Sequence, residues 1–123
     1  MDEKALREVW RKASEIEGLD PDMFRKDPCG AIIMWSQYGS TTQFGWVVDH
    51  IYPLSLGGDD FIGNLRPMHW ENNQSKGSDY PIYSSAVSSN GTSNIPDKKE
   101  FCINPETRKL ISEYYHLEEK AND

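Results

Sequence analysis

Apolar residues recur at three- and four-residue steps near the start of the chain, with polar residues between them. This spacing predicts one amphipathic helix over residues 2–18, because positions three and four apart share a helix face. Asp2 precedes the first turn and is suited to cap it. A brief second helical stretch is expected at residues 23–25. The apolar stripe of the first helix consists of Leu6, Val9, Trp10, Ala13 and Ile16.

Two runs of β-branched and aromatic residues follow, at 31–35 and 44–48. Such runs are typical of strands. The residues between them, 39–43, are rich in Gly, Ser and Thr and favour a turn. The simplest interpretation is a hairpin that pairs the two strands with each other.

The segment after these strands is expected to contain one short strand and one helix. Residues 64–66 form at most a short strand. Pro67 is suited to the first position of a helix, where its missing N–H is not needed. The helix then continues through 68–76, and Gly77 ends it.

The last third of the chain begins with a stretch rich in Ser and Asn, residues 84–95, which is expected to be a flexible connection. A C-terminal strand and helix are expected over residues 100–118. Asn104 is suited to cap this helix, and Pro105 to occupy its first position. The predicted buried face of the helix consists of Leu110, Ile111, Tyr114 and Leu117.

These elements predict a single α+β domain over residues 1–123. Hydrophobic residues make up 37% and aromatic residues 11% of the chain, which is enough for one packed core. Thirteen basic and 20 acidic residues give a net charge of −7. This balance argues against a protein that coats nucleic acid without specificity, because such a protein needs a basic surface.

The sequence also predicts a cytoplasmic protein. No apolar run approaches the roughly 18 residues that a membrane-spanning helix needs. The first residues mix acids and bases and lack the apolar stretch of a secretory signal. Cys29 and Cys102 are far apart and neither lies in a CxxC pair, which excludes a zinc ribbon and a thioredoxin-like motif.

Residues with catalytic and metal-binding chemistry gather in the middle of the chain. Asp49 and His50 are adjacent at the end of a predicted strand, where they point to opposite sides unless the chain bends. His69 and Asn73 are four apart in the predicted helix and share a face, and Lys76 follows on that side. A carboxylate, an imidazole and an amide together suit a divalent cation such as Mg²⁺ or Mn²⁺.

The ordered pattern of this segment resembles the HNH, or ββα-metal, endonuclease family. The resemblance implies an α+β fold with a ββα-metal core at about 44–77, flanked by an N-terminal and a C-terminal helix. A dipeptide alone would carry no weight, but here several separated elements occur in order. The elements are Asp49-His50, Pro53, Gly57-Gly58-Asp59, Asn64-Leu65 and Asn73-x-x-Lys76-Gly77.

The resemblance also implies roles for particular residues. His50 matches the general base that takes a proton from the attacking water. Asn64 matches the asparagine that ties the loop to the strand and keeps the histidine ring in orientation. Asp49 and Asn73 match the metal ligands, and His69 lies where some members place an additional histidine ligand.

By the same resemblance the chain is expected to be a hydrolase that cleaves DNA phosphodiester bonds and leaves 5′-phosphate and 3′-hydroxyl ends. Arg66 and Lys76 are the candidates for phosphate contacts. One divalent cation is expected, with Mg²⁺ preferred and Mn²⁺, Ni²⁺ or Zn²⁺ as alternatives. No structural zinc is expected, because the two CxxC pairs that hold it in many members are missing.

Other interpretations of the same residues stay open. Asp49-His50 alone is also typical of a surface turn, and His69 beside Trp70 is also typical of simple packing. The acidity of the chain is compatible with a tethering protein partner or with a catalytically silent HNH-fold module that binds DNA or protein. A third alternative is the nuclease component of a toxin or phage-defence system. The sequence does not determine the oligomeric state.

Overall fold

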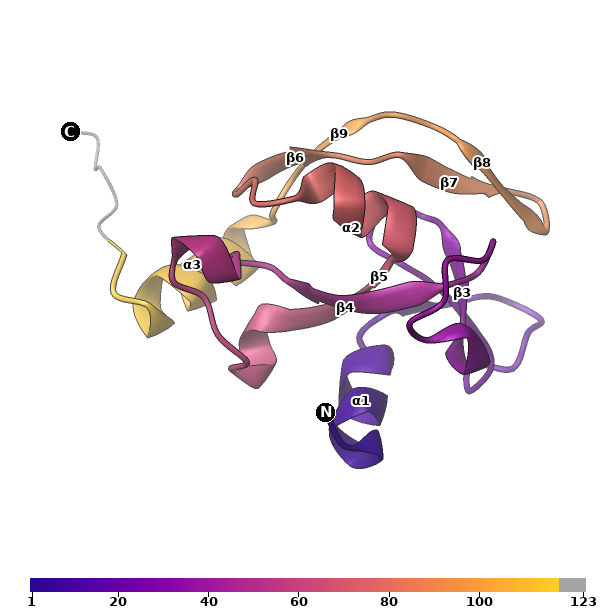
Figure 1. Ribbon diagram of the computed structural model, residues 1–123, viewed down its shortest axis with the longest axis horizontal. Helices are drawn as coiled ribbons and strands as arrows, with labels where there is room; N and C mark the ends of the chain where they lie inside the picture. Colours follow the sequence, from indigo (N-terminus) through magenta and orange to yellow (C-terminus); the bar gives the residue numbers. More distant parts are fainter. Residues whose placement is uncertain (118–123) are drawn as a thin grey trace.

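The computed structural model describes residues 1–117 and has both helices and strands, as predicted for an α+β fold. Its strands form four small antiparallel sheets, ordered β1–β2–β3, β4–β5, β6–β9 and β7–β8 (Figure 1). The elements are α1 (Glu3–Trp10), β1 (Ser14–Glu15), β2 (Phe24–Lys26), β3 (Ile32–Met34), η1 (Trp35–Gln37), β4 (Trp46–His50), η2 (Leu54–Leu56), η3 (Ile62–Asn64), β5 (Leu65–His69), α2 (Trp70–Lys76), β6 (Ile82–Ser84), β7 (Val87–Asn90), β8 (Ser93–Pro96), β9 (Glu100–Cys102) and α3 (Pro105–Tyr114).

The centre of the molecule is a ββα unit made of β4, β5 and α2. The two strands are antiparallel, with Asp49 opposite Arg66 and His50 opposite Leu65. Figure 1 shows α2 between this strand pair and the ribbon of β6 and β9. This unit agrees with the ββα core expected at 44–77, and with helices on both sides of it in the chain.

The hairpin expected between residues 31–35 and 44–48 is wrong. β3 pairs with β2, and β4 pairs with β5. Residues 23–25 are accordingly not helical, since β2 covers Phe24–Lys26. Pro67 is also not the start of a helix, because it lies in β5 opposite Val48. A two-stranded ladder tolerates proline, since each strand has a free edge to which a missing N–H can point.

The first helix is shorter than predicted, although its cap is correct. The Asp2 carboxylate accepts a hydrogen bond from the Ala5 N–H at 2.8 Å. The helix ends at Trp10, and the chain turns so that β1 can pair with β2. The buried guanidinium of Arg25 explains this end, because it donates to the carbonyl oxygens of Arg11 and Ala13, which a longer helix would use internally.

Residues 84–95 are not an irregular connection as expected, but form the end of β6, all of β7 and most of β8. The hairpin of β7 and β8 is attached to β3 through Asn94. The Asn94 side chain accepts from the Ile32 N–H at 2.7 Å and donates to the Ile32 carbonyl at 2.9 Å. This polar segment therefore forms an ordered hairpin, which its composition did not indicate, and the hairpin is bonded to β3.

The C-terminal strand and helix agree with the prediction as far as the structure describes them. Asn104 caps α3 by accepting from the Thr107 N–H at 2.8 Å. Ile111 is fully buried, but Leu110 and Tyr114 are exposed, so the buried face is narrower than expected. Residue 118, the predicted end of this helix, lies outside the described residues. Within residues 1–117 no helix is long and apolar enough to cross a membrane.

A buried carboxylate joins the segment before β3 to the junction of β5 and α2. One oxygen of Asp27 accepts from the N–H groups of Cys29 and Ala31, each at 2.9 Å. The other accepts from the His69 N–H and the Asn72 side-chain amide, each at 3.0 Å. Asp27 is only 3% exposed. These four bonds brace the ββα unit.

Candidate active site

The carboxylate of Asp49 is the centre of a charged cluster. Asp49 is 2% exposed. Its Oδ2 accepts from Nε of Arg66 at 2.8 Å, and its Oδ1 accepts from the Asn73 side-chain amide at 3.2 Å. Nζ of Lys76 lies 3.5 Å from the same Oδ1. The strand pairing brings Arg66 opposite Asp49, and α2 supplies the other two side chains. Four of the residues singled out from the sequence thus meet at one point.

Neither cation of this cluster is freely exposed, as phosphate contacts would need, since even the more accessible Arg66 side chain is only 13% exposed. Lys76 is 1% exposed and donates to the carbonyl oxygen of His50 at 3.0 Å. Burial lowers its pKa, which Asp49 only partly offsets. Burial also works against the charge of Arg66, but the attraction of Asp49 and of Tyr83 raises its pKa overall. Here both side chains pair with the carboxylate of Asp49 and not with an external anion.

His50 lies at the edge of this cluster and is accessible. Its side chain is 22% exposed, and its Nε2 is 2.8 Å from Oδ1 of Asp60. Within the described part of the chain its other ring nitrogen, Nδ1, makes no hydrogen bond. Asp49, His50 and Asn73 line one depression of about 290 Å³. The carboxylate and the imidazole therefore reach the same hollow although they are neighbours at the end of a strand.

Asn64 is fully buried and holds the loop that follows His50. Its side-chain oxygen accepts from the Tyr52 N–H at 2.7 Å. Its amide donates to the carbonyl oxygens of Tyr52 and Asp59, at 3.0 and 3.1 Å. Among the described residues its hydrogen bonds go to the loop backbone and not to the His50 ring.

His69 does not join the cluster, which corrects its expected place on the helix face with Asn73. It ends β5 and caps α2, with Nδ1 accepting from the Glu71 N–H at 3.1 Å. Since Nδ1 accepts, the proton is on Nε2, which lies 2.8 Å from the Gln43 carbonyl oxygen. In the ladder it is three pairs from Asp49, or roughly 10 Å. Both ring nitrogens of His69 are therefore engaged by other groups, and strand alternation points its side chain to the opposite face from Arg66 and Asp49.

Comparison with protein families gives a match over this part of the chain. The family model described as HNH endonuclease matches residues 46–82. We refer to residues 46–82 as the HNH segment, after the family model that matches them. This range contains β4, β5 and α2 with Asp49, His50 and Asn73. Comparisons with curated proteins and with solved structures give no match.

The side chains of the HNH segment offer few ligand atoms, so a cation bound there would keep much of its water. These ligand atoms fit a divalent cation. HNH endonucleases generally use such an ion. Within residues 1–117 no group of three or more His, Cys, Asp and Glu side chains could hold a metal. Asp49 and Asn73 would supply one carboxylate and one amide oxygen, a set that suits Mg²⁺ bound together with water and phosphate. Asn73 now presents its NH₂ to Asp49, so its amide must turn over to act as a ligand.

The HNH segment also contains residues beside the candidate site that the sequence analysis missed. Asp60 contacts the His50 ring, but its position after Gly57, Gly58 and Asp59 suggested only a turn. Asp59 meets Tyr115, which lies just after α3 and more than 50 residues away along the chain. No local pattern predicts such a contact.

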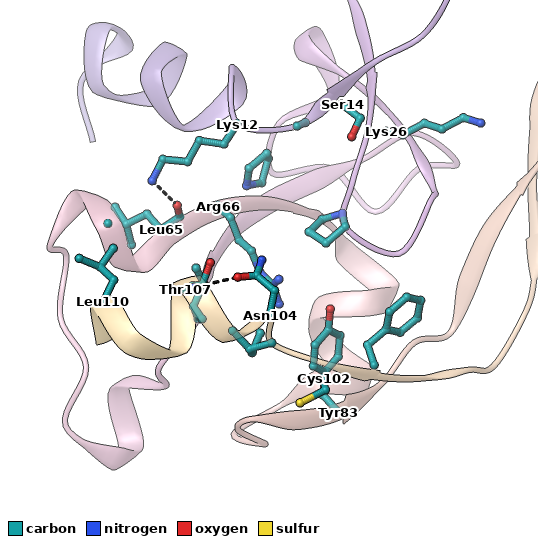
Figure 2. A pocket seen from close by; sticks show the side chains of 17 residues that line it. Lys12, Ser14, Lys26, Leu65, Arg66, Tyr83, Cys102, Asn104, Thr107 and Leu110 are labelled. Atoms are coloured by element: carbon teal, nitrogen blue, oxygen red, sulfur yellow. Dashed lines mark hydrogen bonds between the residues drawn. The ribbon is translucent and has the colours of Figure 1, made fainter. Parts of the chain in front are cut away.

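A second hollow, of about 490 Å³, lies beside the HNH segment and shares Arg66 with the cluster around Asp49 (Figure 2). Neither Asp49 nor His50 lines it. Lys12 borders it, but its ammonium group donates to the Leu65 carbonyl at 2.7 Å, and burial lowers its pKa. The Lys26 side chain points away from it in Figure 2. Of the two hollows, the depression at His50 is therefore the candidate active site.

Proposed function

We propose that this protein is a metal-dependent endonuclease that hydrolyses phosphodiester bonds in DNA. The observation that carries the proposal is the meeting of Asp49 and Asn73, with 3.2 Å between Oδ1 and Nδ2, beside an accessible His50 in one depression. The proposal is supported by the HNH endonuclease match over the same residues.

His50 is the general base of the proposed reaction. Nε2 is engaged by Asp60, so Nδ1 is the nitrogen left to take a proton from water. Asp49 and Asn73 hold the divalent cation, for which we propose Mg²⁺. When bound, the cation stabilises negative charge on the phosphate and on the leaving oxygen. Lys76 donates to the His50 carbonyl and lies beside Asp49, so it keeps the base and the ligand at a fixed separation.

The test is cleavage of supercoiled plasmid by the full chain with Mg²⁺, Mn²⁺ or Ni²⁺. We expect nicking that EDTA abolishes, and products that DNA ligase reseals because they carry 5′-phosphate and 3′-hydroxyl ends. Loss of a general base lowers rates by roughly 10²–10⁴-fold, and we expect a loss in this range for His50→Ala.

The matched control is His116→Asn. His116 is an exposed histidine with a φ of 55°, a backbone conformation that asparagine tolerates. This variant should cleave as the wild type does. Equal cleavage by wild type and His50→Ala would refute the role of His50 and point to a contaminating nuclease.

A catalytically silent HNH-fold module that binds DNA or protein is the second candidate. It is favoured by the charge of the site, since within residues 1–117 no side chain of Lys or Arg lines the depression at His50, and the chain carries a net charge of −7. DNA binding in gel-shift experiments without nicking in any of the three metals would support this candidate and reject the enzyme.

A further inference from the structure

We propose that Asp60 is a positioning residue that fixes the ring of His50 for proton transfer. This inference rests on the proposed function, in which His50 is the base. It starts from one contact, the 2.8 Å between Nε2 of His50 and Oδ1 of Asp60. Asp60 touches neither Asp49 nor Asn73, so it acts on the reaction only through the imidazole.

The chemistry of the contact determines which ring nitrogen is available. An ionised carboxylate can only accept hydrogen bonds, so the proton of the neutral ring must be on Nε2. The lone pair is then on Nδ1, which has no hydrogen bond within the described residues. Asp60 therefore selects both the orientation of the ring and the nitrogen that faces water.

The loop that carries Asp60 is held by its neighbours and not by Asp60 itself. Asn64 donates to the Asp59 carbonyl at 3.1 Å. The Asp59 carboxylate accepts from the Tyr115 hydroxyl at 2.6 Å, and its N–H donates back to that hydroxyl at 3.1 Å. A Cβ at Gly58 would lie 1.9 Å from the Tyr52 carbonyl oxygen, so only glycine fits there. The loop is thus held by contacts that do not involve the contact between Asp60 and His50.

Asp60 contributes little to the stability of the fold, which makes its role testable. Its side chain is 78% exposed, and exposed ion pairs add little to stability. Removing it should leave the loop and the core intact, because the contacts of the loop belong to Asp59, Asn64 and Tyr115. A change in activity would then report on the ring and not on unfolding.

The first experiment follows the imidazole of His50 by ¹H–¹⁵N NMR in the metal-free full chain, at about pH 8.5 where an ordinary histidine is neutral. In the wild type we expect an Nε2–H proton that exchanges slowly with water. Asp60→Asn should retain this proton, because the amide oxygen can accept the same bond. Asp60→Ala should lose it.

The second experiment measures plasmid nicking by the same proteins. Hydrogen-bond partners of metal-ligating histidines typically contribute 10- to 100-fold to affinity or activity, and we expect a loss of this order in kcat when Asp60→Ala removes the partner of His50. KM should change by less than about twofold, since Asp60 does not touch DNA in this proposal. Asp60→Asn should recover most of kcat. Asp22→Ala, which removes an exposed carboxylate with no side-chain hydrogen bond, is the charge-matched control and should behave as the wild type.

The outcomes separate this inference from the proposed function. If Asp60→Ala keeps the slow Nε2–H proton or the wild-type kcat, the positioning role is refuted. It is also refuted if Asp60→Asn is as impaired as Asp60→Ala, because then the charge matters and not the hydrogen bond. If the wild type cleaves no DNA, the proposed function fails, and the NMR result still decides whether Asp60 fixes the ring.

Discussion

Removing the carboxylate of Asp49 would leave two buried cations without their shared counter-ion. Arg66 donates to it at 2.8 Å, and Lys76 lies 3.5 Å away with almost no exposure. Breaking a buried pair by deleting one partner typically costs about 3–5 kcal/mol. We expect Asp49→Asn to lower the free energy of unfolding in urea by about this amount, measured without metal.

The same substitution tests the metal site. Mn²⁺ should raise the unfolding free energy of the wild type, since a ligand that binds only the folded state stabilises it. Mn²⁺ should not stabilise Asp49→Asn. Asp22→Asn, at an exposed position, should keep both the stability and the response to Mn²⁺. An Asp49→Asn protein as stable as the wild type would contradict the charge arrangement described for the site.

At the scale of elements, the ββα unit depends on Asp27. Its carboxylate accepts four hydrogen bonds, which connect the segment before β3 to the start of α2. Asp27→Ala leaves these buried donors unsatisfied, and each such group costs about 1–3 kcal/mol. Because some donors will find water, we expect a total loss of about 3–5 kcal/mol. Thermal unfolding followed by circular dichroism would measure it.

The matched variant for Asp27 is Asp97→Ala. Among the described residues the Asp97 carboxylate pairs with Lys99, whose side chain is 64% exposed, and such pairs contribute at most about 1 kcal/mol. A similar small effect of Asp27→Ala would show that the ββα unit is braced by packing alone.

The elements also show which parts of the fold can be predicted from sequence. The caps Asp2 and Asn104 were predicted correctly, because a cap depends on residues three positions away. The strand that pairs with β4 was predicted wrongly, because strand pairing depends on contacts distant in sequence. The hairpin of β7 and β8 was hidden by its polar composition, and Asn94 attaches it to a segment more than 60 residues away.

In the candidate site, too, some features could be predicted from the sequence and others could not. Asp49, His50 and Asn73 were proposed from their order in a family pattern, and they line one depression. The burial of Arg66 and Lys76 could not be predicted, since both residue types are usually exposed and only the folded chain shows that Asp49 neutralises them. The position of His69 was mistaken because the helix begins at Trp70, one residue after His69, and not at Pro67.

At the scale of the whole molecule, one core joins the HNH segment to the flanking parts of the chain. It includes side chains from before β3, from β5, from β6 and from α3, so these parts of the fold pack against the HNH segment. Cys29 lies in this core with its Sγ 4.0 Å from the Tyr83 hydroxyl. The buried members are Cys29, Ile51, Met68, Tyr83, Ile103 and Ile111. The helix α1 packs against β4 in a second cluster.

Because of the Cys29 thiol, the stability of the fold should decrease at alkaline pH. Burial, with a contribution from Asp27, raises its pKa from 9.0 to about 12. Above pH 9 the thiol ionises in the unfolded chain but not in the fold, so the free energy of unfolding falls as pH rises. By pH 10 the stability of the wild type relative to Cys29→Ala should therefore fall by about 1–2 kcal/mol from its value at pH 7, measured by urea unfolding. Cys102 is exposed, and Cys102→Ala should show no such change relative to the wild type. A constant difference between wild type and Cys29→Ala across this range would mean that the core admits the thiolate.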